Sequence, residues 1–203
     1  MTTTGAGETE TLRGRHDTRQ RIQSVALELF AEQGYDKTSL REIAERLGVT
    51  KAALYYHFKS KEDIVASLME DYFAEIDELL AWGRTQPRTP AARAEILTRY
   101  FEIIHSGTGV FQMIQHNQAS VNSLSAAKNR AARSRERMHA LVDVISGPGA
   151  SLTSQIRAAT ALASVSFGCI FYGEKAKSPD ELREAVLGTA FELTGAQPEP
   201  GQP

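Results

Sequence analysis

Helix-breaking residues are almost absent from the first third of this chain. Between Arg15 and Trp82 there is no proline, and the only glycines are Gly34 and Gly48. Because glycine and proline commonly end helices and open turns, a stretch this poor in both favours helices with two sharp interruptions. No strand-like alternation of apolar and polar residues is sustained along the sequence. The pattern therefore predicts an all-α protein.

Apolar spacing places two helices around these glycines. A stripe at i, i+3, i+4, i+7 and i+8 predicts a first helix that Gly34 ends. The stripe consists of Ile22, Val25, Ala26, Leu29 and Phe30. Ser39 and Glu42 have the spacing of a capping box, which opens a second helix of about two turns. Gly48 closes that helix.

Two further helices follow at once. Thr50 is placed to cap a third, short helix, and Ser60 with Asp63 forms another capping box. That second box opens a long fourth helix, which continues to Gly83. We assign Ile43, Leu54 and Phe58 to the core of this segment.

The remainder of the sequence also favours helices. Gly107 and Gly109 are expected to end the first of them, and Ser178 caps the last, which ends at Gly195. The predicted helices span about 91–105, 125–145, 152–172 and 179–194, with a less regular segment over 110–121. Both chain ends, residues 1–15 and 197–203, are expected to be disordered.

Charge and cysteine content limit the classes of function. The formal net charge is −2, but residues 13–61 carry ten Lys/Arg against six Asp/Glu, a net charge of +4. This asymmetry suits a polyanion-binding segment on an acidic body. The single cysteine, Cys169, excludes an intrachain disulfide and is expected to be a buried, inert thiol.

Targeting features are also sparse. We find no run of about 18 apolar residues and no apolar core of a secretory signal in the polar N-terminus. The sequence therefore predicts a cytoplasmic protein with no membrane partner.

The turn over residues 47–50 joins two helices in the manner of a helix-turn-helix, whose second helix enters the major groove of DNA. Small side chains at Ala52 and Ala53 would let that helix approach closely. Its other residues can reach phosphates or base edges, namely Thr50, Lys51, Tyr55, Tyr56 and His57.

Residues 19–69 resemble the DNA-binding region of the tetracycline-repressor (TetR) family. The resemblance lies in LFAEQGYDKTSLREIAERLGV followed without a gap by TKAALYYHFKSKEDIVASLM. It implies an N-terminal three-helix helix-turn-helix domain and a C-terminal helical ligand-binding and dimerisation domain. The implied function is a transcriptional repressor, not an enzyme, which a small molecule releases from a palindromic operator. The implied boundaries are 1–15, 16–62, 63–196 and 197–203 for arm, DNA-binding domain, C-terminal domain and tail.

Carried over by position, the resemblance implies a set of DNA contacts. Lys51 and Thr50 are the candidates for base edges, because first-turn residues of a recognition helix point deepest into the groove. Ser39 and Thr50 can serve as helix caps, as phosphate contacts, or as both. The implied set is Thr38, Ser39, Arg41, Thr50, Lys51, Ala52, Tyr55, Tyr56, His57 and Lys61.

Three points around this set stay open. Tyr55 and Tyr56 are not expected to face solvent together, and Tyr56 is the predicted outward ring, with Tyr55 on the core. His57 is either a reader of DNA or a polar surface histidine. The arginines before the first helix either enter the minor groove or belong to a solvated tail; these are Arg13, Arg15 and Arg19.

The C-terminal body is expected to form a homodimer and to bind a small-molecule effector. The resemblance implies a four-helix bundle between two copies, built from the last two long helices, although the same stripes could pack only within one chain. It also implies an effector pocket between the middle helices, and the apolar candidates favour an apolar or aromatic ligand. The candidates are Trp82, Tyr100, Phe101, Ile104, His105, Phe111, Met113, Ile114, Gln115, Met138 and Phe167.

A basic run and two other classes of protein stay open beside the regulator. A basic run over residues 128–137 is either an anion site or the solvated face of a helix. The chain could be a ligand-binding helical dimer without DNA binding, or a small helical enzyme. The enzyme is disfavoured, because the sequence has no Gly-rich phosphate loop, no HExxH motif and no nucleophile elbow. No cofactor and no metal are predicted.

Overall fold

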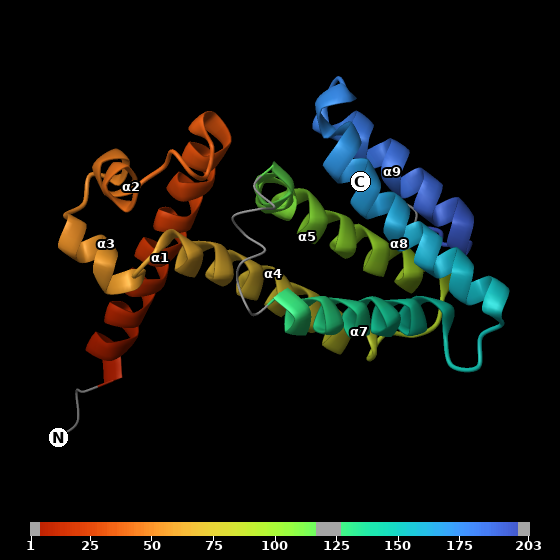
Figure 1. Cartoon of the computed structure of the whole chain (residues 1–203). Helices are drawn as coiled ribbons and strands as arrows, with labels where there is room; N and C mark the ends of the chain where they lie inside the picture. Colours follow the sequence, from red (N-terminus) through yellow and green to blue (C-terminus); the bar gives the residue numbers. More distant parts are fainter. Residues whose placement is uncertain (1–4, 117–126, 199–203) are drawn as a thin grey trace. The chain divides into compact units, whose positions relative to one another are not determined.

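The computed structural model describes residues 5–116 and 127–198, and every regular element within them is a helix (Figure 1). The all-α prediction is therefore confirmed. The chain divides into two compact units, with one boundary between Glu70 and Asp71 and another after Phe111. The helices are α1 (Gly5–Gln33), α2 (Leu40–Leu47), α3 (Lys51–His57), α4 (Lys61–Gly83), α5 (Pro90–His116), α7 (Ala127–Ser146), α8 (Leu152–Tyr172) and α9 (Pro179–Thr194), with a 3-10 turn over Gly173–Lys175.

The N-terminal unit is built around one apolar core. The predicted core residues Ile43, Leu54 and Phe58 are all buried in it, with the α1 stripe and the first turns of α4. Two buried hydrogen bonds join α1 to α4 within this core. The Gln23 side-chain amide donates to the Ser67 hydroxyl at 2.9 Å, and that hydroxyl donates to the Ile64 carbonyl at 2.8 Å. Each buried polar atom in these bonds is thereby paired, so α1 and α4 are held in one register.

The turn between α2 and α3 depends on glycine. Gly48 has φ = +72°, the left-handed conformation that costs a residue with a side chain about 1–2 kcal/mol. From this conformation the Gly48 and Val49 amides donate to the carbonyls of Glu45 and Ala44, at 3.1 and 3.0 Å. This pairing ends α2, and Thr50 then caps α3 by accepting from the Ala53 amide at 3.1 Å.

The C-terminal unit has its core among α4, α5, α7, α8 and α9. Helices α8 and α9 run antiparallel and side by side (Figure 1), and a Cβ atom at Gly168 would collide with Val186. Inside the core, the hydroxyls of Tyr100 and Ser166 lie 2.8 Å apart and join α5 to α8. The predicted last helix is confirmed residue for residue, from its Ser178 cap to Gly195.

Three boundaries differ from the sequence prediction. Helix α1 starts at Gly5, so residues 5–15 are helical and the disordered arm was wrong for them, because without proline nothing interrupts the hydrogen-bond ladder. Gln197 donates to the Pro90 carbonyl at 3.1 Å, so the first residue of the expected disordered tail is bonded to the start of α5. The first unit extends past residue 62, because Ile64 and Val65 lie in its core.

Helix α5 gives the clearest correction. Gly107 and Gly109 were expected to end it, yet it continues to His116. Glycine disfavours a helix interior by only about 1 kcal/mol relative to alanine. Ile104 and Val110, on either side, are both buried, and their packing outweighs that cost. Residues 125–126 of the next predicted helix lie outside the described residues.

These two glycine environments predict opposite effects of the same substitution. We expect Gly48→Ala to lower the free energy of unfolding by about 1 kcal/mol through left-handed strain. Gly109→Ala is the control: it lies in a helix and a Cβ there meets open space, so it should raise stability by about 0.5–1 kcal/mol. Thermal unfolding followed by circular dichroism measures both. A neutral or stabilising Gly48→Ala would contradict the turn.

One helical stretch among the described residues, Leu152–Lys175, is long and apolar enough to cross a membrane, on length and composition alone. The stretch is not an unbroken apolar run, because small and hydroxyl side chains are interspersed with the large ones.

Cys169 lies on the buried face of α8, as predicted. Burial, with the Glu102 carboxylate as a second cause, raises the pKa of its thiol to about 11. Only the thiolate is an effective nucleophile. We therefore expect Ellman's reagent at pH 8 to modify the native chain about 100-fold more slowly than the chain unfolded in guanidinium, because both thiolate fraction and access fall on folding. Equal rates would contradict the burial.

Candidate nucleic-acid interface

The start of α2 is closed by the predicted capping box. The Ser39 hydroxyl accepts from the Glu42 amide at 3.2 Å, and the Glu42 carboxylate accepts from the Ser39 amide at 2.7 Å. The hydroxyl also donates to the same carboxylate at 2.7 Å, and these bonds lower the pKa of Glu42. Ser39 is exposed, so the cap role is confirmed and the phosphate contact stays a prediction.

Thr38 is a correction. Its side chain is only 2% exposed, and its hydroxyl donates to the Gly34 carbonyl at 2.9 Å. The Leu29 carbonyl lies at 3.3 Å and the Gln33 amide donates from 3.3 Å. The hydroxyl thus ties the end of α1 to the following turn and does not face a phosphate. Adjacent hydroxyls at a helix start look alike in sequence, but only the cap position points outward.

Arg41 extends from the exposed side of α2. Its guanidinium donates to the Glu45 carboxylate at 2.7 Å, and both side chains are mostly exposed. Such a surface pair contributes little to stability and exchanges readily for another anion. Arg41 therefore remains a candidate for a phosphate or base contact.

Helix α3 presents one continuous outward face. Lys51, Ala52, Tyr55 and Tyr56 are all exposed, while Leu54 between them is fully buried. Positions i, i+1, i+4 and i+5 share one side of a helix, so these four side chains form a single surface. We call this surface the α3 face.

As predicted, Tyr56 is more exposed than Tyr55, but both rings lie at the surface. Tyr56 is 61% exposed and is the outward ring, whereas Tyr55 is 36% exposed and does not enter the core. The ammonium of Lys51 lies 5.5 Å from the centre of the Tyr55 ring, which holds that ring along the surface. The expectation that Tyr55 packs on the core was wrong, because Leu54 and Phe58 already fill that side of α3. His57 is half-buried, with its ring edge-to-face against Tyr56.

Two lysines support the end of α3 and the turn after α1. The ammonium of Lys61 donates to the Tyr35 carbonyl at 2.5 Å and lies 4.3 Å from the Tyr35 ring centre. Its predicted DNA contact is untested, and any such contact competes with this bond. Lys59, which the sequence analysis did not single out, donates to the Tyr55 carbonyl at 2.7 Å. The sequence could have indicated this bond, because Lys59 is a basic residue four positions after Tyr55, near a helix C-terminus.

Tyr35 anchors the same turn from below. Its buried ring packs on Phe30 at 5.1 Å between centres, and its hydroxyl donates to the Glu62 carboxylate at 2.7 Å. That bond lowers the pKa of Glu62, while burial raises the pKa of the Tyr35 phenol. At neutral pH the carboxylate is therefore charged and the phenol neutral, as this hydrogen bond requires.

The arm before α1 is only partly described. The Arg19 guanidinium lies 5.0 Å from the centre of the Phe58 ring, which places this side chain on the domain and not on a solvated tail. The side chains of Arg13 and Arg15 lie outside the described part of the chain.

The candidates for the effector pocket lie mainly in the core of the C-terminal unit. Tyr100, Phe101 and Ile104 are buried core residues, and Trp82 and Met138 pack against that core. Tyr100 and Met138 line a common cavity, whose volume of about 20 Å³ suits one water molecule. The effector pocket itself stays a prediction.

The other members of the predicted pocket lie elsewhere. His105 is exposed and stacked on Phe101 with 5.4 Å between ring centres, and the ring of Phe111 meets Tyr72 edge-on at 5.0 Å. Phe167 is 54% exposed on α8. The side chains of Met113, Ile114 and Gln115 lie outside the described residues.

Comparison with known proteins agrees with the N-terminal geometry. A family model described as "Bacterial regulatory proteins, tetR family" matches residues 22–68. The HTH-type transcriptional regulator AcrR of Shigella flexneri is 49% identical over 63 residues, 31% of this chain and 29% of that protein. The HTH-type transcriptional repressor KstR2 of Rhodococcus jostii (strain RHA1) is 31% identical over 103 residues, 49% of this chain and 50% of that protein. The matched regions thus span half or less of these relatives.

A solved structure extends the likeness over most of the fold. The crystal structure of AibR in complex with isovaleryl coenzyme A and operator DNA superposes with a TM-score of 0.62 at 18% identity. The match covers 88% of this chain and 99% of that one. It shows that both units follow one known all-helical fold.

Proposed function

The N-terminal domain of this chain belongs to the tetR family of bacterial regulatory proteins, and we propose that the protein is a sequence-specific DNA-binding transcriptional regulator that acts as a repressor. The relatives matched through this domain are transcriptional regulators, and KstR2 is named a repressor. Pairing and control by a small molecule, the other parts of the proposal, concern the C-terminal unit. That unit lies beyond the sequence matched by the family model.

The observation that carries the proposal is the α3 face. A helix of seven residues buries only Leu54 and exposes a lysine, a small residue and two tyrosines on one side. Small residues let such a helix sit deep in the major groove, the lysine can reach a base edge or phosphate, and a tyrosine hydroxyl can reach the backbone. The exposed Ser39 and Arg41 on α2 would fix the helix against the flanking phosphates.

Reading a palindrome needs two copies, and α8 offers a surface for pairing. Its exposed side carries apolar residues four or seven positions apart, with a small residue between the large ones. Ile156 is 56% and Phe167 is 54% exposed, which is unusual for large apolar side chains. We call this surface the α8 stripe; it comprises Leu152, Ile156, Ala163, Phe167 and Phe171. We propose that it pairs with its copy in a homodimer.

The same stripe explains why α8 has the composition of a membrane span. The opposite side of α8 is buried in the core of its own unit, at Ala158, Ala161, Leu162, Val165 and Cys169. Lipid could surround the helix only if that core came apart. Pairing with a second copy covers the stripe and leaves the core intact, so we favour a dimer in the cytoplasm over membrane insertion.

Control by a small molecule completes the proposal. The AibR structure holds both isovaleryl coenzyme A and operator DNA, so a chain of this fold can bind an effector and DNA. We propose that an effector releases this protein from its operator. An apolar or aromatic effector stays a prediction.

An electrophoretic mobility shift tests the function. DNA from upstream of the protein's own coding sequence should be bound in preference to a scrambled fragment, and binding should weaken steeply from 50 to 200 mM salt. No salt-sensitive binding to any DNA would leave the ligand-binding dimer without DNA contacts as the better description.

A further inference from the structure

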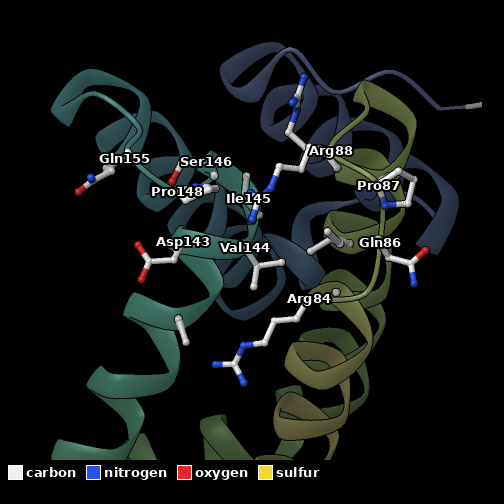
Figure 2. A pocket seen from close by; sticks show the side chains of 17 residues that line it. Arg84, Gln86, Pro87, Arg88, Asp143, Val144, Ile145, Ser146, Pro148 and Gln155 are labelled. Carbon is white, nitrogen blue, oxygen red and sulfur yellow. The ribbon is translucent and has the colours of Figure 1, made fainter.

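A second feature of the C-terminal unit is a polar cleft at one end of its helices. It has a volume of about 530 Å³ and lies where α4 and α7 end and α5 and α8 begin. Figure 2 shows Arg84, Gln86 and Arg88 on one wall and Asp143, Ser146 and Gln155 on the other. The volume lies within the range of about 300–1,000 Å³ that suits small-molecule ligands. It is about 25 times that of the cavity at Tyr100.

Three arginines line the cleft: Arg84, Arg88 and Arg93. None of them forms an ion pair with a carboxylate in the part of the chain that the structure describes. Asp77 on α4 is paired with Arg137 at 2.6 Å, and Arg84 adds a weaker attraction that also lowers the pKa of the Asp77 carboxyl. Guanidinium groups without an ion pair that gather in one hollow are a natural binding site for an oxyanion.

Two of the arginines lie against backbone at the edge of the cleft. A guanidinium nitrogen of Arg88 lies close to Gly147, 2.9 Å from the point that a Cβ there would occupy. A terminal nitrogen of Arg93 donates to the Gly195 carbonyl at 3.4 Å, while its Nε is buried with no hydrogen-bond partner among the described residues. A buried donor without a partner is unfavourable, and a bound acceptor would remove that penalty.

The other side chains leave the charge of the cleft positive. Asp143 is the single carboxylate that lines it, so the net charge of the lining side chains is +2. The Gln155 amide donates to the Ala150 carbonyl at 3.1 Å, and the Ser146 hydroxyl to the Val142 carbonyl at 2.8 Å. With these donors satisfied locally, the arginines are the groups left to recognise a ligand.

We propose that this cleft binds a small, hydrophilic molecule carrying a phosphate or clustered carboxylates. Arg84 and Arg88 hold the oxyanion from the α4–α5 wall, and Arg93 donates from the start of α5. Asp143 opposes the anion and keeps its affinity moderate. This site is separate from the α3 face and does not depend on the proposed function.

Isothermal titration calorimetry of the full chain at low salt tests the site. The probes are sodium pyrophosphate, sodium citrate and, as a neutral control, glucose. We expect one of the two anions to bind saturably with one site per chain, and Arg84→Ala/Arg88→Ala to weaken that binding at least about tenfold. Asp143→Asn should strengthen it several-fold, because it removes the opposing charge. Which anion binds more tightly distinguishes a phosphate ligand from a carboxylate ligand.

Arg135→Ala is the matched control, because Arg135 is exposed on α7 and does not line the cleft. It should bind the anion as the unmodified chain does. The proposal is overturned if neither anion binds saturably, if glucose binds as well, or if the double variant and Arg135→Ala behave alike. The gain in Asp143→Asn keeps the test decisive if the double variant is destabilised, since loss of folding cannot strengthen binding.

Discussion

Replacing Lys51 and Tyr56 together with alanine is expected to lower operator affinity by about 100-fold or more, because in the proposed mode of binding each side chain would contact both half-sites. Both residues lie on the α3 face, and neither contributes to the core. The fold should therefore survive the change while the contacts are lost. Fluorescence anisotropy against the operator identified by mobility shift measures the effect.

Two further variants separate the roles of these residues. Tyr56→Phe removes only the hydroxyl, so it should match Tyr56→Ala if the hydroxyl contacts a phosphate. Lys177→Ala removes an exposed lysine after α8 and should leave affinity unchanged. If the double variant binds as tightly as Lys177→Ala does, the α3 face is not the reading surface.

Phe167→Glu is expected to convert the proposed dimer into a monomer and to lower operator affinity by about 100-fold, since half-site binding would lose the avidity of the pair. The side chain lies toward the C-terminal end of the α8 stripe, and its ring is 4.6 Å from that of Phe171 between centres. A carboxylate there would be buried against the partner's apolar surface without a counter-charge. Analytical ultracentrifugation compares the mass in solution with the 22.3 kDa of one chain.

The control places the same charge on another face of the unit. Ala81→Glu lies on the exposed side of α4 and should leave the mass at twice that of one chain. A Phe167→Glu variant that stays dimeric would show that the chains pair through a different surface. An unmodified chain that is monomeric at all concentrations would exclude the homodimer itself.

Local rules predicted the parts of this fold that local chemistry decides. The Ser178 cap, Pro179 at the first helical position and Gly195 after the last determine α9 without help from the rest of the molecule. The capping box at Ser39 and the left-handed Gly48 did the same for the helix-turn-helix. In each case the signal is local: a capping side chain bonds to nearby backbone, or a glycine or proline sets the backbone conformation at a helix end.

The incorrect predictions concern features that contacts between distant parts of the chain decide. Gly107 and Gly109 do not break α5, because residues far away in sequence bury the turns around them. Neighbouring hydroxyls at Thr38 and Ser39 point in opposite directions, which only the packing of the preceding turn decides. The arginine cleft was not predicted at all, since its lining comes from four helix ends separated by up to about seventy residues.

The shielding of Cys169 makes this chain suitable for site-specific labelling. It holds the only sulfhydryl in the sequence, so a cysteine introduced on the surface would be the one group that reacts with a maleimide dye in the native protein. Ser24 on α1 is exposed, close to cysteine in size and not part of the α3 face. The rotation of a fluorophore there would slow when the chain binds its operator, with no need to remove the native thiol from the core.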